Sequence, residues 1–190
     1  MGSGSGWRGG FRRRLPKLPQ DPASSEAARS KAIGWLARRD YPSKLLRARL
    51  GEAGFEADAA ESAVADLEDA RYVNDERYVE AAIAGRAARG QGPVRIALEL
   101  HRQRCPKELV ESLLRRDDPE WKDRAVALRL RRFGAGEPAD ARERQRQIRF
   151  LLQRGFTAAQ VRAALTDVGG SAEVDLDDQQ VDLEGDETDD

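Results

Sequence analysis

The 190-residue chain has one cysteine, one histidine and one methionine, and no long run of apolar residues. Its single cysteine, Cys105, excludes a disulfide within the chain and is typical of a protein in a reducing compartment. No apolar run reaches the ~18 residues that a membrane-spanning helix needs. Aromatic residues make up only 6% of the chain, which favours thin helical layers over one thick core. We expect a cytoplasmic, monomeric protein with no membrane contact.

The motifs of common catalytic and metal sites are also missing. The sequence contains no G-x-x-x-x-G-K-S/T, no H-E-x-x-H and no C-x-x-C, so it gives no sign of a phosphate-binding P-loop or a zinc site. His101 and Cys105 stand four residues apart, but a structural zinc ion needs four ligands. Both continue an apolar stripe, and we expect them to pack at a boundary between repeats. We therefore expect no cofactor, no metal and no catalytic residue.

The net charge of −1 conceals a strong asymmetry along the chain. Residues 1–20 carry four Arg and one Lys without an acid, whereas residues 171–190 carry ten Asp or Glu without a base. Between them the chain is mildly basic. A basic arm, a basic body and an acidic tail indicate a protein that works on or near a polyanion. We expect the arm to be flexible and the tail to be disordered, because the tail has too few large apolar side chains to fold.

Proline, glycine and Asn/Asp signals divide the middle of the chain into helices, and no segment there alternates like a β-strand. The signals predict nine helices, at about residues 25–39, 43–53, 57–70, 76–89, 93–104, 106–116, 119–133, 139–154 and 157–168. The acids at Asp117-Asp118, and Asn74 with Asp75, are interpreted as residues that start a helix, because their side chains accept hydrogen bonds from free backbone N–H groups.

Three segments of the sequence align in register, starting at Leu50, Leu100 and Leu151, with steps of 50 and 51 residues. Phe55, Cys105 and Phe156 stand five residues later, and counted from them apolar residues recur at offsets of +5, +8 and +9, which share one face of a helix. Gly54 and Gly155 stand where a helix is expected to end in a left-handed residue, and Arg104 occupies the equivalent position. A non-glycine residue there costs about 1 kcal/mol.

These patterns predict an all-α protein of three tandem three-helix repeats that stack into an elongated, curved, short solenoid of either hand. The expected parts are a flexible basic arm (1–23), repeat 1 (24–73), repeat 2 (74–117), repeat 3 (118–170) and a disordered acidic tail (171–190). A single compact all-α bundle is the alternative.

Arginines concentrate where the first helix of each repeat is expected to end. They are Arg38 with Arg39, Arg86 with Arg89, and Arg131 with Arg132, and the middle helices add others, including Arg95, Arg102 and Arg149. Complementing the helix macrodipole, or forming a solvated face, would explain some of them. Because Arg pairs in two-pronged fashion with carboxylates and phosphates, we interpret them as a partner-binding or DNA-binding strip.

Two motifs carry a resemblance to a known family. The turn RYVNDERY at 71–78 and the run GQGPVRIALEL from Gly90 to Leu100, together with the order of the repeats, resemble the bacterial RecX regulatory proteins. The resemblance covers about residues 25–168. It matches the family's core motif at Tyr72, Asp75, Tyr78, Gly90, Gly92, Arg95, Ile96 and Leu100, most of which we expect to be architectural. Arg104-Cys105 departs from the family's usual Gly and aliphatic residue.

The resemblance implies a curved helical protein that modulates, and usually inhibits, the RecA recombinase, lodged in the groove of the RecA–DNA filament. It would thus act in DNA recombination, repair and the SOS response. The expected contacts are Arg86, Arg89 and Arg95, then Arg38, Arg39, Arg131 and Arg132. Weak, electrostatic binding to single- and double-stranded DNA is also expected. The alternative is a sequence-independent DNA-binding helical protein without a recombinase partner.

The acidic tail allows two interpretations. It could keep the protein soluble. It could instead imitate a chain of phosphates, occupy the basic strip or pair with Arg12, Arg13 and Arg14, and so compete with DNA.

Overall fold

The structure, a computed structural model, describes residues 18–166. The predicted acidic tail lies outside the described residues, as does the basic arm as far as residue 17. Within them no helix is long and apolar enough to cross a membrane.

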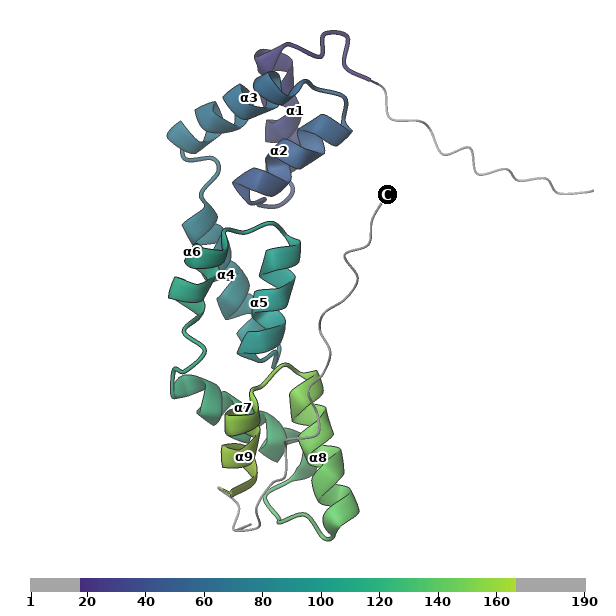
Figure 1. Ribbon diagram of the computed structural model, residues 1–190, viewed down its shortest axis with the longest axis vertical. Coiled ribbons are helices and arrows are strands. Elements are labelled where there is room, and N and C mark those ends of the chain that lie inside the picture. The colour runs from purple at the N-terminus through teal and green to yellow at the C-terminus, as the bar shows by residue number, and fades with distance from the viewer. Residues whose placement is uncertain (1–17, 167–190) are drawn as a thin grey trace, which may run out of the picture. The chain divides into compact units, whose positions relative to one another are not determined.

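Residues 18–166 fold into nine α-helices without a β-strand, which confirms the predicted fold class. Figure 1 shows the helices in chain order. Their bounds are α1 (Ser25–Leu36), α2 (Ser43–Glu52), α3 (Ala57–Asp69), α4 (Asp75–Ala88), α5 (Pro93–Arg102), α6 (Lys107–Leu114), α7 (Glu120–Phe133), α8 (Ala141–Gln153) and α9 (Ala158–Thr166).

The helices pack in threes. Close helix–helix contacts join α1, α2 and α3, then α4, α5 and α6, then α7, α8 and α9. The chain divides into two compact units, one ending at Asn74 and the other beginning at Asp75. Buried apolar residues form one cluster in each unit, so the single compact bundle, the alternative that the sequence left open, is wrong for the described residues.

The three repeats end their middle helices with the same hydrogen-bonded turn. The N–H groups of Phe55, Cys105 and Phe156 donate to the carbonyls of Leu50, Leu100 and Leu151 at 3.1, 3.1 and 3.2 Å. The residue before each of them has a positive φ, which is 96° at Gly54, 61° at Arg104 and 89° at Gly155. This is the Schellman motif, which satisfies the last carbonyls of a helix. The predicted register is therefore confirmed, and Arg104 takes the same left-handed conformation as the two glycines although its side chain disfavours it.

Several predicted helix ends differ by one to three residues from those in the structure, and the largest difference is at the end of α1. α1 ends at Leu36, so Arg38 and Arg39 follow the helix rather than form its last turn. Their N–H groups both donate to the carbonyl of Trp35, at 3.0 and 3.3 Å, so one of the last free carbonyls of the helix is satisfied by the turn that ends it. α4 begins at Asp75 instead of Glu76, which leaves Asn74 directly before the helix.

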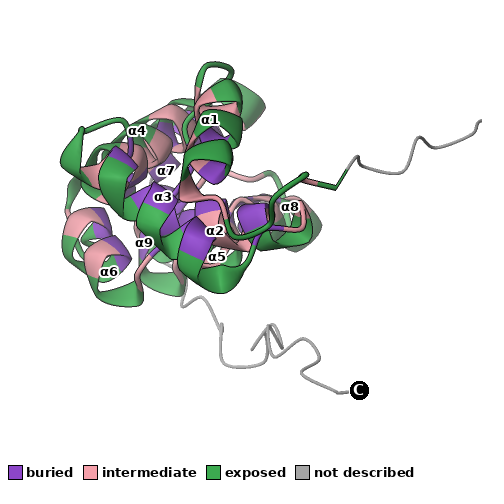
Figure 2. Ribbon diagram, turned by 90° about the horizontal axis from the view of Figure 1, so that it is seen from above, coloured by how far each residue is buried: buried purple, intermediate pink, exposed green. Residues whose placement is uncertain are grey.

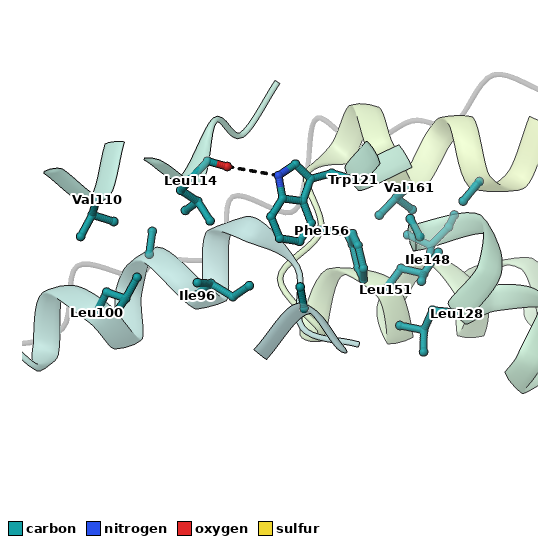
Figure 3. Close-up of a cluster of buried hydrophobic side chains, with 14 of the residues drawn as sticks. Ile96, Leu100, Val110, Leu114, Trp121, Leu128, Ile148, Leu151, Phe156 and Val161 are labelled. Carbon is teal, nitrogen blue, oxygen red and sulfur yellow. Dashed lines mark hydrogen bonds between the residues drawn. The ribbon is translucent and has the colours of Figure 1, made fainter. Parts of the chain in front are cut away.

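Each repeat buries one side of each helix and exposes the other, as Figure 2 shows for α3. The aligned positions provide the buried side: Ala60, Val110 and Val161 are 3%, 0% and 0% exposed. In the second unit a single cluster joins repeats 2 and 3. Trp121 and Phe156 lie in its middle, and the Trp121 indole N–H donates to the carbonyl of Leu114 at 3.3 Å (Figure 3).

Backbone contact holds repeats 2 and 3 together. The N–H of Gly92 donates to the carbonyl of Arg154 at 2.7 Å, and the N–H of Val94 donates to that of Gly155 at 3.0 Å. A Cβ atom on Gly92 would collide with the backbone of Gly155, and one on Gly155 would lie 2.6 Å from the backbone nitrogen of Arg95. The two backbone segments, one around Gly92 and one around Gly155, come this close because both glycines lack a side chain.

Candidate partner-binding surface

Each repeat has a corner where its middle helix packs against the end of its first helix. The residue before the aligned leucine faces this corner in all three repeats, and it is Arg49 in α2, Glu99 in α5 and Phe150 in α8. The three residues hold the corner by different chemistry. Many of the predicted contact arginines lie at these corners. The contacts at each corner decide which arginines pair within the chain and which stay exposed to a partner.

In repeat 1 the corner is a stack of arginines on aromatic rings. The Arg49 guanidinium lies 4.9 Å from the centre of the Trp35 ring and 5.0 Å from that of Tyr41, and it also donates to the Tyr41 hydroxyl. Arg39 lies 4.4 Å from the Tyr41 ring, while Arg38 and Arg39 are both exposed. Such contacts hold the cations by attraction to the negative face of the ring.

In repeat 2 the corner is an ion-pair cluster around Glu99. Arg86 Nε donates to its carboxylate at 2.7 Å, and Arg95 Nε donates at 3.3 Å. The hydrogen bond from Arg86, assisted by Arg95, lowers the pKa of Glu99 although burial opposes the shift. The structure therefore brings Arg86 and Arg95 together through an acid that the sequence interpretation did not single out.

The predicted contact residues of repeat 2 differ in how far they are free to meet a partner. The side chain of Arg86 is only 13% exposed, whereas that of Arg95 is 49% exposed. Arg89 follows the end of α4 and is exposed. Because Arg86 is largely buried and paired, its charge orders the corner, and Arg89 and Arg95 present the exposed charges.

In repeat 3 aromatic residues replace the ion pair. The rings of Phe133 and Phe150 meet edge to face with their centres 5.3 Å apart. Arg132 and Arg146 lie 5.6 and 5.5 Å from the centre of Phe133. Arg131 and Arg132 are exposed, as a partner surface requires.

Arg129 is a buried arginine that the sequence interpretation missed. It is fully buried, and its guanidinium donates to the Gln147 side chain at 2.9 Å and to the carbonyls of Gly134 and Gly136 at 3.4 and 2.6 Å. Burial lowers its pKa. Its place four residues after the buried Ala125 was the signal that could have revealed it. It fastens the loop between α7 and α8.

A groove of 720 Å³ runs beside the junction of repeats 2 and 3, between α5, α8 and the start of α9. Val94, Leu98, Leu152 and Phe156 give it an apolar lining, and Arg95, Arg102, Arg149 and Glu99 are the charged residues along it. Arg95 reaches across the groove, where its guanidinium donates to the carbonyl of Gln153 at 3.4 Å. The groove therefore continues from the repeat 2 corner, and Arg102 and Arg149 are exposed along it.

The core-motif residues lie in different surroundings, some inside repeat 2 and some at its surface. Leu100 is fully buried, and Gly90 ends α4 with a φ of 75°. The Tyr78 hydroxyl donates to the Gln103 side chain at 2.6 Å, tying α4 to the end of α5. Asp75 is the first residue of α4. Tyr72 is 55% exposed in the segment between α3 and α4.

His101 and Cys105 belong to none of the side-chain clusters that a metal ion requires. Among residues 18–166, no group of three or more His, Cys, Asp and Glu side chains is placed to hold a metal ion. Cys105 is buried in the core of the second unit. Burial, with the negative charge of Asp75, raises the pKa of its thiol to about 11, so the reactive thiolate is scarce at neutral pH.

The fold and these corners define a class: an all-helical protein of three-helix repeats with arginine-rich corners. Family models match each repeat, namely the first, second and third three-helix domains of RecX at residues 28–67, 74–114 and 118–165. The chain belongs to the RecX family of regulatory proteins.

Relatives named as regulatory protein RecX agree with this assignment. The chain is 39% identical over 158 residues to the regulatory protein RecX of Halorhodospira halophila, covering 83% of this chain and 94% of that protein. It is 34% identical over 152 residues to that of Xanthomonas axonopodis pv. citri, covering 76% and 94%. The crystal structure of RecX from Lactobacillus salivarius shares the fold, with a TM-score of 0.67 at 17% identity and coverage of 76% and 96%.

Proposed function

We propose that this chain inhibits the RecA recombinase by binding the RecA–DNA filament. The observation that carries the proposal is that RecX models match all three repeats. In this role the chain acts by presenting a surface, and at the corners of the repeats that surface is rich in arginine. It acts in the cytoplasm as a monomer, without a cofactor.

The exposed arginines at the repeat 2 corner make the central contact. Arg89 and Arg95 can pair with carboxylates of RecA and with phosphates of the DNA that RecA encloses. Glu99 and the largely buried Arg86 hold α4 and α5 together, so the corner is ordered before binding. Ordering beforehand reduces the entropy lost on association. Arg38, Arg39, Arg131 and Arg132 add contacts from the other two repeats.

Inhibition of the DNA-dependent ATPase of RecA, measured across a salt titration, tests the proposal. Binding to naked DNA falls steeply with salt because it depends on displaced counterions. We expect inhibition to persist at a salt concentration where this protein no longer binds naked single-stranded DNA. Inhibition that disappears together with DNA binding would contradict a RecA contact. It would favour the alternative, a sequence-independent DNA-binding protein that competes for DNA.

A further inference from the structure

The groove between repeats 2 and 3 has a lining that suits a particular kind of peptide. Val94, Leu98 and Leu152 are half-buried in the groove wall, and Phe156 lies beneath them. Arg95, Arg102 and Arg149 are its three cations. Glu99, its acid, is already engaged by Arg86. An apolar floor with cationic edges fits a peptide whose apolar residues alternate with carboxylates.

The chain itself contains such a segment. Residues 171–190 read SAEVDLDDQQVDLEGDETDD, with ten acids and no base. Its large apolar side chains fall in two identical V-D-L triplets, seven residues apart, at 174–176 and 181–183. In each triplet a carboxylate stands between two apolar residues. A simple solubilising tail would need the charges but not this repeated apolar pattern.

The connection is long enough. α9 begins at Ala158, which lines the groove, and ends at Thr166. Eight residues of helix carry the chain about 12 Å away from the groove. The eight residues from Thr166 to Val174 can span up to about 26 Å when extended. The first triplet can therefore return to the groove with slack to spare.

We propose that residues 173–184 of the acidic tail dock in this groove within the same molecule. The valines and leucines of the triplets cover Val94, Leu98 and Leu152, and the carboxylates pair with Arg95, Arg102 and Arg149. The docked tail occupies the exposed guanidinium of Arg95, which belongs to the proposed partner surface. The docking itself requires neither RecA nor DNA.

Paramagnetic relaxation enhancement in the full chain tests the docking. A nitroxide label is attached at position 185 through Gly185→Cys, and Cys105 stays unlabelled because it is buried with a thiol pKa of about 11. The backbone amides of Leu98, Arg102 and Gln153 should lose most of their signal intensity. Ser112, exposed on α6 outside the groove, should keep its intensity. Equal, weak attenuation across the second unit would overturn the proposal.

Two sets of variants separate specific docking from general attraction between opposite charges. The first variant replaces the four apolar residues of the triplets by serine: Val174→Ser, Leu176→Ser, Val181→Ser and Leu183→Ser. It leaves every charge in place and should abolish the selective loss of signal intensity. Persistence of the effect would contradict docking on the apolar floor. Arg102→Glu with Arg149→Glu should abolish it as well, whereas the matched pair Lys107→Glu with Lys122→Glu, exposed outside the groove, should not.

A mixing experiment distinguishes docking of a molecule's own tail from docking of the tail of a second copy. Spin-labelled protein at natural isotope abundance is added to unlabelled, ¹⁵N-enriched protein. Loss of intensity at Leu98 and Arg102 only within a labelled chain supports docking within one molecule. The same loss in the mixture would overturn it and assign the groove to the tail of a second copy. None of these experiments contains RecA. A failure of the docking proposal is therefore distinct from a failure of the proposed function.

Discussion

At the scale of single residues, charge and backbone conformation explain what the corners can do. Glu99 joins two arginines that look like equivalent contacts in the sequence, and it leaves Arg86 largely buried and Arg95 half exposed. The pair Arg95 and Glu99 could be expected from their spacing of four in a helix. The pairing of Arg86 with Glu99 could not, since it depends on how α4 crosses α5.

Replacing Glu99 by glutamine should lower the melting temperature at pH 7 but not at low pH. The pKa of Glu99 is lowered in the folded protein, so its charge stabilises the fold above the unfolded pKa of about 4.3. That stabilisation is lost as the pH falls through the lower, folded value. For this partly buried ion pair we expect about 1 kcal/mol at pH 7. Thermal melts of Glu99→Gln against native protein from pH 7 to 3 measure it.

The matched control is Glu111→Gln, since Glu111 is exposed and lies 3.9 Å from Lys107. It should change the melting temperature little at either pH. A Glu99→Gln deficit of the same size at pH 7 and pH 3 would show that Glu99 acts by packing rather than by charge.

Arg104 stands in a conformation that its side chain disfavours. Its φ of 61° matches the glycines at the same position of repeats 1 and 3, and the left-handed region costs a non-glycine residue about 1–2 kcal/mol. Arg104→Gly should therefore stabilise the second unit, by roughly 0.5 kcal/mol after the extra entropy of unfolded glycine is deducted. Urea denaturation measures the change.

Arg162→Gly provides the opposite case, because it also replaces an exposed arginine by glycine but does so inside a helix, α9. It should destabilise the protein by about 0.5–1 kcal/mol. If Arg104→Gly destabilised the protein to the same extent, the strain assigned to Arg104 would be wrong.

At the scale of helices and their connections, the sequence carries most of the information about the fold. Leu50, Leu100 and Leu151 mark the end of the middle helix in every repeat, and the residues five positions later are buried as their alignment predicted. Helix periodicity is local, so it can be found without knowing the partner. The groove depends instead on the contact between Gly92 and Gly155, which lie 63 residues apart and show no periodic signal.

Gly92→Ala should weaken the joint between repeats 2 and 3. The added methyl group would meet the backbone of Gly155, which has no flexible end that could move aside. Such overpacking costs about 1–3 kcal/mol, and the free energy of unfolding should fall by this amount in urea denaturation.

Gly34→Ala is the companion variant, because a Cβ atom at this position in α1 meets nothing within 4 Å. It should stabilise the helix by about 0.5–1 kcal/mol. Unchanged stability of Gly92→Ala would mean that the two backbones can separate without loss, and the groove would then not be a fixed feature.

At the scale of the whole molecule, three versions of one unit carry three chemically different corners. Arginine on aromatic rings, an ion-pair cluster and an aromatic pair hold the same helix junction. The repeated architecture keeps the arginines at corresponding corners, while the variation decides how many of them remain exposed. The sequence predicted where the arginines gather, but their division between internal and external roles required the packing of the helices.

The most direct test of the proposed function is the affinity of the chain for RecA filaments assembled on immobilised single-stranded DNA. The double variant Arg89→Ala with Arg95→Ala is compared with Lys107→Ala and Lys122→Ala, which removes two exposed cations elsewhere. A desolvated, charge-assisted hydrogen bond is worth about 1.5–3 kcal/mol, and about 1.4 kcal/mol is tenfold in affinity. We predict that the arginine variant, with its helices intact by circular dichroism, binds at least about tenfold more weakly than native protein, whereas the lysine variant binds normally. Equal affinity of all three proteins would contradict the assignment of the repeat 2 corner as the surface that binds RecA.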